Sequence, residues 1–157
     1  MNSLKKNNVK IISSGCTYNE IKKLKFKCLE VSEFTSFPEI LEGRVKTLHP
    51  KIHAGILNRR DSKLHLKDLR VNNFENIDLV IVNFYPFENT FKNTNNHNKI
   101  IENIDVGGPT MVRSAAKNYK DVTVITSTEQ YAKLIDQLKK YKAVSYTHLT
   151  LPTIYSV

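Results

Sequence analysis

Residues 77–84, IDLVIVNF, carry the strongest strand signal in the chain. A nearly continuous apolar run is what a central parallel strand needs when helices cover both of its faces. The run ends in Asn83, Phe84 and Tyr85, so polar groups follow at its carboxyl end. In open α/β sheets, ligands bind at this edge. The stretch therefore predicts both the middle of the fold and its functional edge.

Shorter segments on either side alternate between strand and helix patterns. We expect further strands at residues 9–13, 27–31 and 122–125, and helices at residues 18–24, 51–57, 62–72, 100–104 and 129–140. Gly107, Gly108 and Pro109 predict the start of another helix, and the Asn-rich residues 88–99 predict an exposed loop. This alternation predicts an α/β fold with a mainly parallel sheet between two layers of helices.

Composition bounds the function classes. The 157 residues fit one domain, and no run is long enough to span a bilayer or resembles a secretory signal. We therefore expect a cytoplasmic protein without a membrane partner. Cys16 and Cys28 lack further ligands at metal-binding spacing, so we expect reduced thiols and no metal. The net charge of +9 is spread along the chain, which predicts solvated lysines or a phosphorylated substrate rather than a nucleic-acid partner.

The loop at residues 43–50, GRVKTLHP, predicts an anion site. Arg44 offers a planar fork of donors, Lys46 a compact charge and Thr47 a neutral donor. Gly43 permits backbone angles that other residues resist, and Pro50 restricts the chain beyond it. We therefore expect a loop of fixed shape that holds a phosphate or a carboxylate.

Two other stretches are candidates for the same edge. Residues 13–17, SSGCT, join a strand to a helix, where free N–H groups favour phosphate, although Ser14 or Thr17 could equally be an ordinary N-cap. Tyr85 is either a functional phenol or a packed aromatic residue with its hydroxyl at the surface. Asp105 and Lys117 flank the predicted helix and need not meet along it, so only the tertiary fold could bring them together.

Three motifs in this order resemble the inosine monophosphate (IMP) cyclohydrolase domain of the bifunctional AICAR transformylase/IMP cyclohydrolase family. They are FPEILEGRVKTLHPKIHAGIL, IDLVIVNFYPF and ENIDVGGPTMVRSAAKN, and the resemblance covers residues 7–140. It implies a methylglyoxal synthase-like three-layer α/β/α sandwich. It also implies the ring closure of formyl-AICAR to IMP with loss of water, in which the carboxamide nitrogen attacks the formyl carbon.

The resemblance assigns roles by position. The catalytic positions are Lys46, Tyr85, Asp105 and Lys117, with Asp105 and Lys117 exchanging protons and Lys46 and Tyr85 polarising the base or relaying a proton. The substrate-binding positions are Ser14, Gly15, Cys16, Thr17, Arg44, Val45, Lys46, Thr47, Val82, Asn83, Asp105, Val106 and Gly107. The ring closure implies no cofactor and no metal. A separate transformylase domain of the family uses 10-formyltetrahydrofolate and brings homodimerisation.

The chain departs from the family pattern at three places. Cys16 replaces the second glycine of the phosphate turn, which weakens binding if that position needs a positive φ. The family's first strand and the start of its first helix are not visible, and residues 1–13 resemble the tail of that helix running into the second strand. This predicts weak folding and little activity for residues 1–143, a partial domain. Residues 144–157 include VSYTHLTLPT, which resembles translated sequencing-adapter DNA, so we expect a non-native tail.

Two rivals share the fold. Methylglyoxal synthase would need its own aspartate and histidine constellation, for which His49 and His53 are available. The allosteric domain of carbamoyl phosphate synthetase would need a phosphate pocket without reactive residues at positions 46, 85 and 117. Nucleic-acid binding ranks last because no stacking platform is visible.

Overall fold

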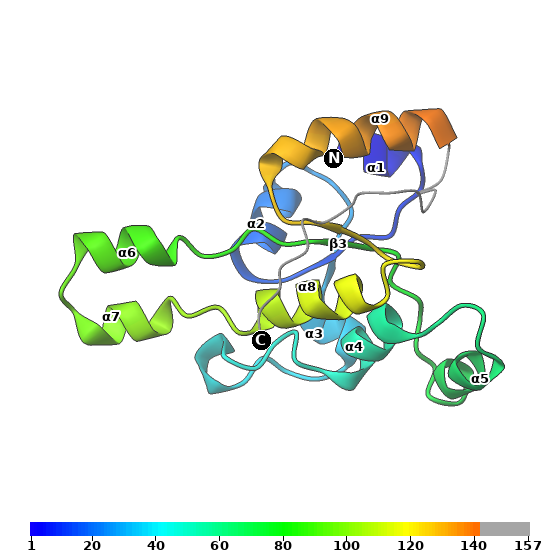
Figure 1. Cartoon of the computed structure of the whole chain (residues 1–157), viewed down its shortest axis with the longest axis horizontal. Helices are drawn as coiled ribbons and strands as arrows, with labels where there is room; N and C mark the ends of the chain where they lie inside the picture. Colours follow the sequence, from blue (N-terminus) through cyan, green and yellow to red (C-terminus); the bar gives the residue numbers. More distant parts are fainter. Residues whose placement is uncertain (142–157) are drawn as a thin grey trace.

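Residues 1–141 are described by the computed structural model, in which helices surround short strands (Figure 1). The strands are β1 (Ile12–Ser13), β2 (Leu29–Glu30), β3 (Leu79–Ile81) and β4 (Thr123–Ile125). The α-helices are α1 (Asn2–Lys6), α2 (Gly15–Lys23), α3 (Val31–Thr35), α4 (Pro50–Leu57), α5 (Lys63–Val71), α6 (Phe87–Asn93), α7 (His97–Glu102), α8 (Gly107–Lys117) and α9 (Tyr131–Tyr141). Short 3₁₀ turns lie at Leu41–Gly43 and Thr128–Gln130.

All strand pairs in this part of the chain are parallel, which confirms the predicted α/β class. β1 pairs with β2, and β3 pairs with β4 in the register Leu79 to Thr123, Val80 to Val124 and Ile81 to Ile125. The ladders are shorter than the predicted strands and form two separate two-stranded sheets. One further bond, from the Val82 N–H to the Ile125 carbonyl at 2.9 Å, extends the β3–β4 pair toward its carboxyl edge.

Helices cover both faces of the β3–β4 pair. Val80, Val82 and Val124 belong to a core that includes Ile52 and Ile56 of α4 and Ala115 of α8. Ile125 belongs to a second core with Leu134 and Leu138 of α9, against which Leu4 of α1 packs. Because successive side chains of a strand point to opposite faces, these two cores make the three layers that Figure 1 shows, with α9 and α1 on one side and α8 and α4 on the other.

Helices α4 and α8 run side by side in the same direction. Thr47, just before α4, contacts Gly107 at the start of α8, and the His53 ring lies 3.1 Å from the Ser114 hydroxyl. At the far end, the Asn118 amide donates to the Ile56 carbonyl at 2.8 Å. Both helices therefore begin at the carboxyl edge of β3–β4 and end at its amino edge.

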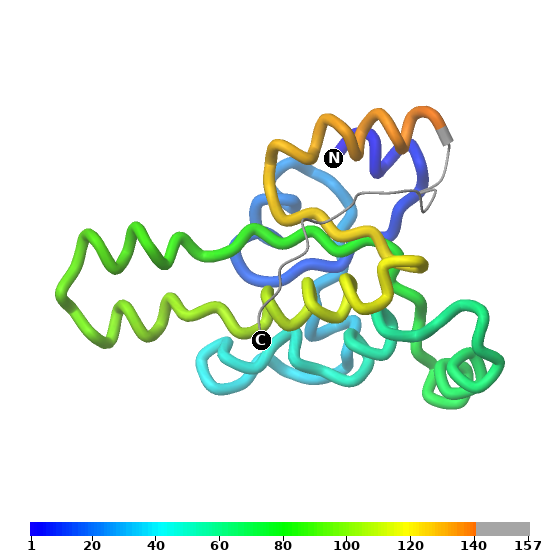
Figure 2. Tube along the Cα trace, viewed as in Figure 1, coloured from blue at the N-terminus to red at the C-terminus, as the bar shows by residue number. Residues whose placement is uncertain are grey.

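Residues 88–99 are not the loop that the sequence predicted. They contribute most of α6 and the start of α7, which form a hairpin that extends away from the body (Figure 2). The Phe87 and Phe91 rings stack at 6.4 Å one turn apart, and Asn96 caps α7 by accepting from the Lys99 N–H at 3.1 Å. Asparagine serves here as a helix cap, so an Asn-rich composition did not indicate a loop.

The other predicted helices are confirmed with small shifts. Helices α4, α5 and α9 match, α2 begins earlier at Gly15, and α3 lacked a sequence prediction. Among residues 1–141, no helix combines the length and the apolar character that a membrane span requires. The predicted tail at 144–157, and with it the predicted domain end at residue 143, lies outside the described residues.

Candidate functional site

The chain enters loop 43–50 through a turn, residues 41–44, that a pair of backbone hydrogen bonds closes. Ile40 and Val45 form an antiparallel bridge, with the Ile40 N–H donating to the Val45 carbonyl at 3.3 Å. The chain turns between them through positive φ angles at Leu41, Glu42 and Gly43. At Gly43, φ is +91°, and a β-carbon would lie 2.6 Å from a Glu39 carboxylate oxygen. Glycine at this position therefore lets Glu39 pack against the loop.

Lys46 links the loop to the turn before α2. Its Nζ lies 2.9 Å from Glu39 Oε2, and its side chain is 24% exposed. A β-carbon on Gly15 would be 3.5 Å from the same Nζ, so the amine lies directly against the first turn of α2. The N-terminal N–H groups of a helix and a lysine ammonium attract the same anion. The charge and the position of Lys46 therefore make this place a candidate phosphate site.

The SSGCT turn provides the other wall of this site. Ser14 is the extended residue before α2 and is half-buried, whereas Gly15, Cys16 and Thr17 are exposed in its first turn. The positive φ of the turn, +56°, belongs to Gly15 and not to Cys16. Cys16 therefore occupies a backbone position that any residue adopts without strain.

Arg44 connects the loop to the hairpin. Its guanidinium pairs with the Glu102 carboxylate at the end of α7, and both side chains are exposed. The hydrogen bond from Arg44 and its charge hold the pKa of Glu102 below its usual range. Arg44 is thus bound by a carboxylate in this arrangement, and an anionic ligand would have to replace Glu102.

Thr47 and Asp105 bring the loop to the start of α8. A β-carbon on Gly107 would lie 2.6 Å from Thr47 Oγ1, so the two segments touch without a side chain between them. Asp105 accepts from the Gly108 N–H at 2.9 Å, and Gly108 also packs against Val82 at the end of β3. The contacts join Lys46, Thr47, Asp105 and Val82 in one row along the carboxyl edge.

Tyr85 lies beside this row. Its side chain is 61% exposed, which favours an accessible phenol over a packed aromatic. A shallow hollow of about 330 Å³ is lined by Phe84, Tyr85, Phe87, Asn103, Ile104, Asp105 and Pro109. Tyr85 and Asp105 therefore face a common space between β3 and the base of the hairpin.

Lys117 does not join the row. It is the last residue of α8 and is exposed, whereas Asp105 precedes the first residue. Eleven helical residues separate the two ends by about 15 Å at 1.5 Å per residue. Because α8 runs away from the carboxyl edge, Lys117 lies at the amino edge, and the predicted meeting of Lys117 with Asp105 is not seen.

The remaining predicted positions lie at the same carboxyl edge. Val45 is in the bridge with Ile40, and Val106 is the exposed residue directly before α8. Asn83 follows the last bonded residue of β3, and its amide lies 3.2 Å from the Tyr131 hydroxyl at the start of α9.

Sequence reasoning missed three residues that contact this edge: Glu39, Glu102 and Tyr131. Glu39 lies within a motif already singled out, so an acidic residue four positions before Gly43 was a usable signal. Glu102 and Tyr131 reach the site from other elements, 58 and 48 residues away from their partners. Pairing over such separations leaves no local pattern in the sequence.

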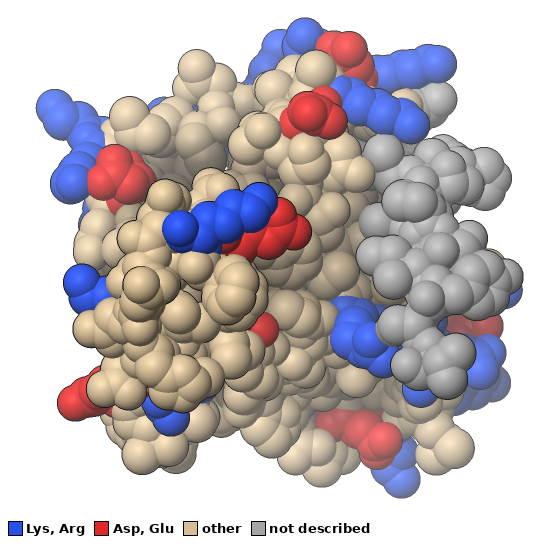
Figure 3. Space-filling view, turned by 60° about the vertical axis from the view of Figure 1, so that its left-hand side comes forward, with Lys and Arg blue, Asp and Glu red and all other residues tan. Residues whose placement is uncertain are grey.

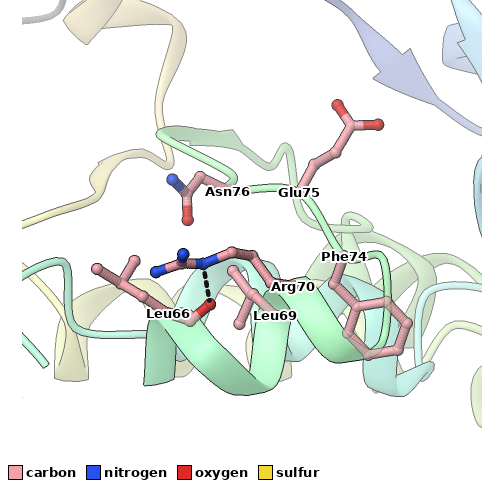
Figure 4. A pocket seen from close by; sticks show the side chains of 6 residues that line it. All are labelled: Leu66, Leu69, Arg70, Phe74, Glu75 and Asn76. Carbon is pink, nitrogen blue, oxygen red and sulfur yellow. Dashed lines mark hydrogen bonds between the residues drawn. The ribbon is translucent and has the colours of Figure 1, made fainter. Parts of the chain in front are cut away.

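A second hollow lies between α5 and the residues that lead into β3 (Figure 4). It measures about 310 Å³ and is lined by Leu66, Leu69, Arg70, Phe74, Glu75 and Asn76. The Arg70 guanidinium turns back and donates to the Leu66 carbonyl at 3.2 Å. Arg70 is the one cation in this lining, and its guanidinium is bonded to its own helix. The hollow is therefore a weaker candidate for an anion site than the carboxyl edge.

His53 lies beneath the loop and is partly withdrawn from water. Its Nδ1 lies 3.1 Å from the Ser114 hydroxyl, which donates to the Thr110 carbonyl at 2.9 Å. Burial lowers the pKa of His53, and the nearby Thr47 carbonyl opposes this effect. His53 of α4 therefore links the segment beneath the loop to α8.

Residues 1–141 contain no metal-binding cluster. No group of three or more His, Cys, Asp or Glu side chains there is arranged to hold a metal ion. On the face drawn in Figure 3, Lys and Arg side chains form several separate groups, some beside acidic side chains, rather than one basic patch. The local cations of the loop are thus the features that point to a ligand.

The chain belongs to the MGS-like domain family, whose model matches residues 1–110. Its curated relatives include proteins called bifunctional purine biosynthesis protein PurH. The one from Prochlorococcus marinus (strain AS9601) is 52% identical over 85% of this chain, and the one from Thermoanaerobacter sp. (strain X514) is 49% identical over 83%. This chain covers 26% of the length of each, so it spans about a quarter of these relatives.

A solved structure agrees with this assignment. The structure titled "Crystal structure of ForH" superposes with a TM-score of 0.77 at 26% sequence identity, covering 90% of this chain and 72% of that one. The family resemblance predicted from three motifs is therefore confirmed, as is the methylglyoxal synthase-like fold class.

Proposed function

We propose that this chain binds a phosphorylated purine nucleotide at the carboxyl edge of β3–β4 and carries IMP cyclohydrolase chemistry there. One observation carries the proposal: the loop 43–50 touches both the Gly15 turn, through Lys46, and the Gly107 turn, through Thr47. A ligand could place its phosphate at the first contact and its base near the second, so both contacts of the loop would serve binding. The names of the PurH relatives support a purine pathway intermediate as the ligand.

The phosphate is proposed to bind between the first turn of α2 and Lys46. Lys46 is the better-placed cation because its Nζ already lies beside Gly15. The Glu39 carboxylate at 2.9 Å keeps this ammonium in place before the ligand arrives. Arg44 would add a bidentate contact once it leaves Glu102.

Ring closure needs a proton acceptor and a proton donor more than it needs a nucleophile from the protein. The carboxamide nitrogen of formyl-AICAR attacks its own formyl carbon and loses a proton as the C–N bond forms, and the formyl oxygen becomes a hydroxyl. A second proton then lets this oxygen leave as water, while the formamide nitrogen loses its proton and forms the C=N bond of the ring. Asp105 is proposed to accept the amide proton, because its carboxylate is fixed by the Gly108 N–H. Tyr85, which lines the same hollow, is proposed to donate to the formyl oxygen.

Lys117, a catalytic position by resemblance, has a different place in the proposal. At the amino edge it contributes neither to phosphate binding nor to the charge beside Asp105. Its catalytic role by resemblance stays a prediction. The 10-formyltetrahydrofolate and the homodimer expected for the family stay predictions that concern a longer protein.

Calorimetric titration with IMP tests the binding half of the proposal. Lys46→Met should weaken IMP binding about 30-fold or more, because a charge-assisted contact to phosphate is lost. Lys133→Met, on the exposed face of α9, is the matched control and should bind as the parent does. Equal affinity in the two variants would contradict the proposed site.

A turnover assay tests the chemical half. The parent chain is given formyl-AICAR or dihydroxyacetone phosphate, and product formation is followed for each. The proposal expects IMP from the first, at the low rate predicted for residues 1–143, and no methylglyoxal from the second. Asp105→Asn should retain most of the IMP affinity while lowering the rate at least about 100-fold, in line with the usual worth of a general acid–base group. A full rate in Asp105→Asn, or methylglyoxal as the product, would overturn it.

A further inference from the structure

The contact between Asn83 and Tyr131 lies at the site edge but has no place in the chemistry described so far. The Tyr131 hydroxyl is 3.2 Å from Asn83 Nδ2 and 3.3 Å from Asn83 Oδ1. A single hydroxyl rotor thus reaches both atoms of the amide. It holds the side chain in place whichever way round the amide lies.

Tyr131 itself is held from two directions. Its ring packs against the core formed by Ile125, Leu134 and Leu138, so the hydroxyl end alone reaches the edge. The preceding turn is fixed by Gln130, whose Oε1 accepts from the Thr126 N–H at 2.8 Å and the Ser127 N–H at 3.2 Å. The Ser127 side chain completes this capping box. A phenol supported in this way is pre-organised, and little rotamer freedom is left to lose.

Asn83 is supported from the strand side. It follows Val82, whose N–H donates to the Ile125 carbonyl at 2.9 Å, so the end of β3 is tied to the end of β4. The Asn83 side chain is nevertheless exposed, and an exposed amide without Tyr131 would sample several rotamers. The contact therefore holds an otherwise mobile side chain in one position.

We propose that Tyr131 is a positioning residue for base recognition, acting through Asn83. The proposal rests on the nucleotide site proposed above and extends it to the choice of base. With the Tyr131 hydroxyl on both amide atoms, one Nδ2–H and one Oδ1 lone pair of Asn83 stay free, on opposite sides of the amide. Each can bond one polar group of a base, such as the O6 or the N1–H of hypoxanthine. Tyr131 thus favours ligands that carry a base over phosphates without one.

Two ligands and one conservative variant separate this role from packing. IMP carries phosphate, ribose and base, whereas ribose 5-phosphate lacks the base. Tyr131→Phe keeps the ring in its core and removes only the hydroxyl. It should weaken IMP binding about three- to tenfold and leave ribose 5-phosphate affinity unchanged, in line with the loss of one hydrogen bond. Tyr119→Phe, at the exposed amino edge, is the matched control and should change neither affinity.

A double-mutant cycle then tests whether the effect passes through Asn83. Asn83→Ala should lose the same preference for IMP, and Tyr131→Phe on that background should add no further loss. Additive losses, or an IMP preference that survives in Asn83→Ala, would overturn the positioning role even if Tyr131→Phe proved unstable. If the parent chain binds neither ligand, the proposed nucleotide site fails instead, so the two failures are distinguishable.

Discussion

The two edges of the β3–β4 pair use polar residues in opposite ways. At the amino edge, buried Asn118 donates to the Ile56 and Asn58 carbonyls at 2.8 Å, and Arg60 donates to Asn58 and Asp78. At the carboxyl edge, Lys46, Arg44 and Asp105 meet carboxylates or glycine backbone and stay partly open to water. A network that satisfies itself stabilises the fold, whereas one that leaves charges at glycine turns is suited to a ligand.

The largest effect that we expect is a loss of stability when the amino-edge network is disrupted. Asn118→Ala removes the side-chain donor of the Ile56 carbonyl and one of the two donors of the Asn58 carbonyl, and should lower the free energy of unfolding by about 2–4 kcal/mol. Urea unfolding measures the loss. Asn98→Ala, on the exposed hairpin, should lose almost nothing. A small loss in Asn118→Ala would mean that the amino edge is not the structural half.

Two glycines give a matched pair across the edges. A β-carbon on Gly55 would meet the Glu75 carbonyl at 2.7 Å, and one on Gly107 would meet Thr47 Oγ1 at 2.6 Å. Gly55→Ala should cost about 1–3 kcal/mol of unfolding free energy through overpacking and leave IMP affinity unchanged. Gly107→Ala should instead displace the loop and weaken IMP binding about tenfold.

Both variants are measured by urea unfolding and by IMP titration. The reverse pattern, with affinity lost in Gly55→Ala and retained in Gly107→Ala, would contradict the division between the edges.

The pH dependence of stability tests the contact between α4 and α8 beneath the loop. The pKa of His53 is lowered in the folded chain from its usual value of 6.5 by burial, so the unfolded chain binds this proton more tightly. The free energy of unfolding should therefore fall as pH drops below about 6.5 and level off above it. Urea unfolding at a series of pH values measures the slope.

His53→Asn should flatten this slope, whereas His97→Asn on the exposed hairpin should keep it. An identical slope in all three chains would show that His53 does not support the loop as described.

The smallest expected effect concerns Lys117, the one predicted catalytic position at the amino edge. Lys117→Met should change IMP affinity by less than about twofold, since the site lies about 15 Å away along α8. Calorimetric titration beside Lys46→Met gives the comparison directly. A loss in Lys117→Met as large as that in Lys46→Met would place both amines at one ligand.

Much of the carboxyl edge could be predicted from the sequence because its signals are local. The run 77–84, the glycine turns and the loop 43–50 each combine a backbone requirement with a chemical group within a few residues. The hairpin was missed because Asn96 and the stacked Phe87 and Phe91 stabilise helices that composition alone disfavours. Glu102 and Tyr131 were missed because their partners come from other elements. The prediction that Lys117 acts with Asp105 rested on their place in one motif, although the length of α8 separates them.

The central claim is that a phosphorylated nucleotide binds at the carboxyl edge, and glycine amides report on it directly. The chain has five glycines, so selective ¹⁵N-glycine labelling gives a simple amide spectrum. Titration with IMP should shift the amides of Gly15, Gly43, Gly107 and Gly108 and leave Gly55, at the amino edge, in place. A spectrum in which Gly55 moves while Gly15 and Gly107 stay fixed would contradict the account.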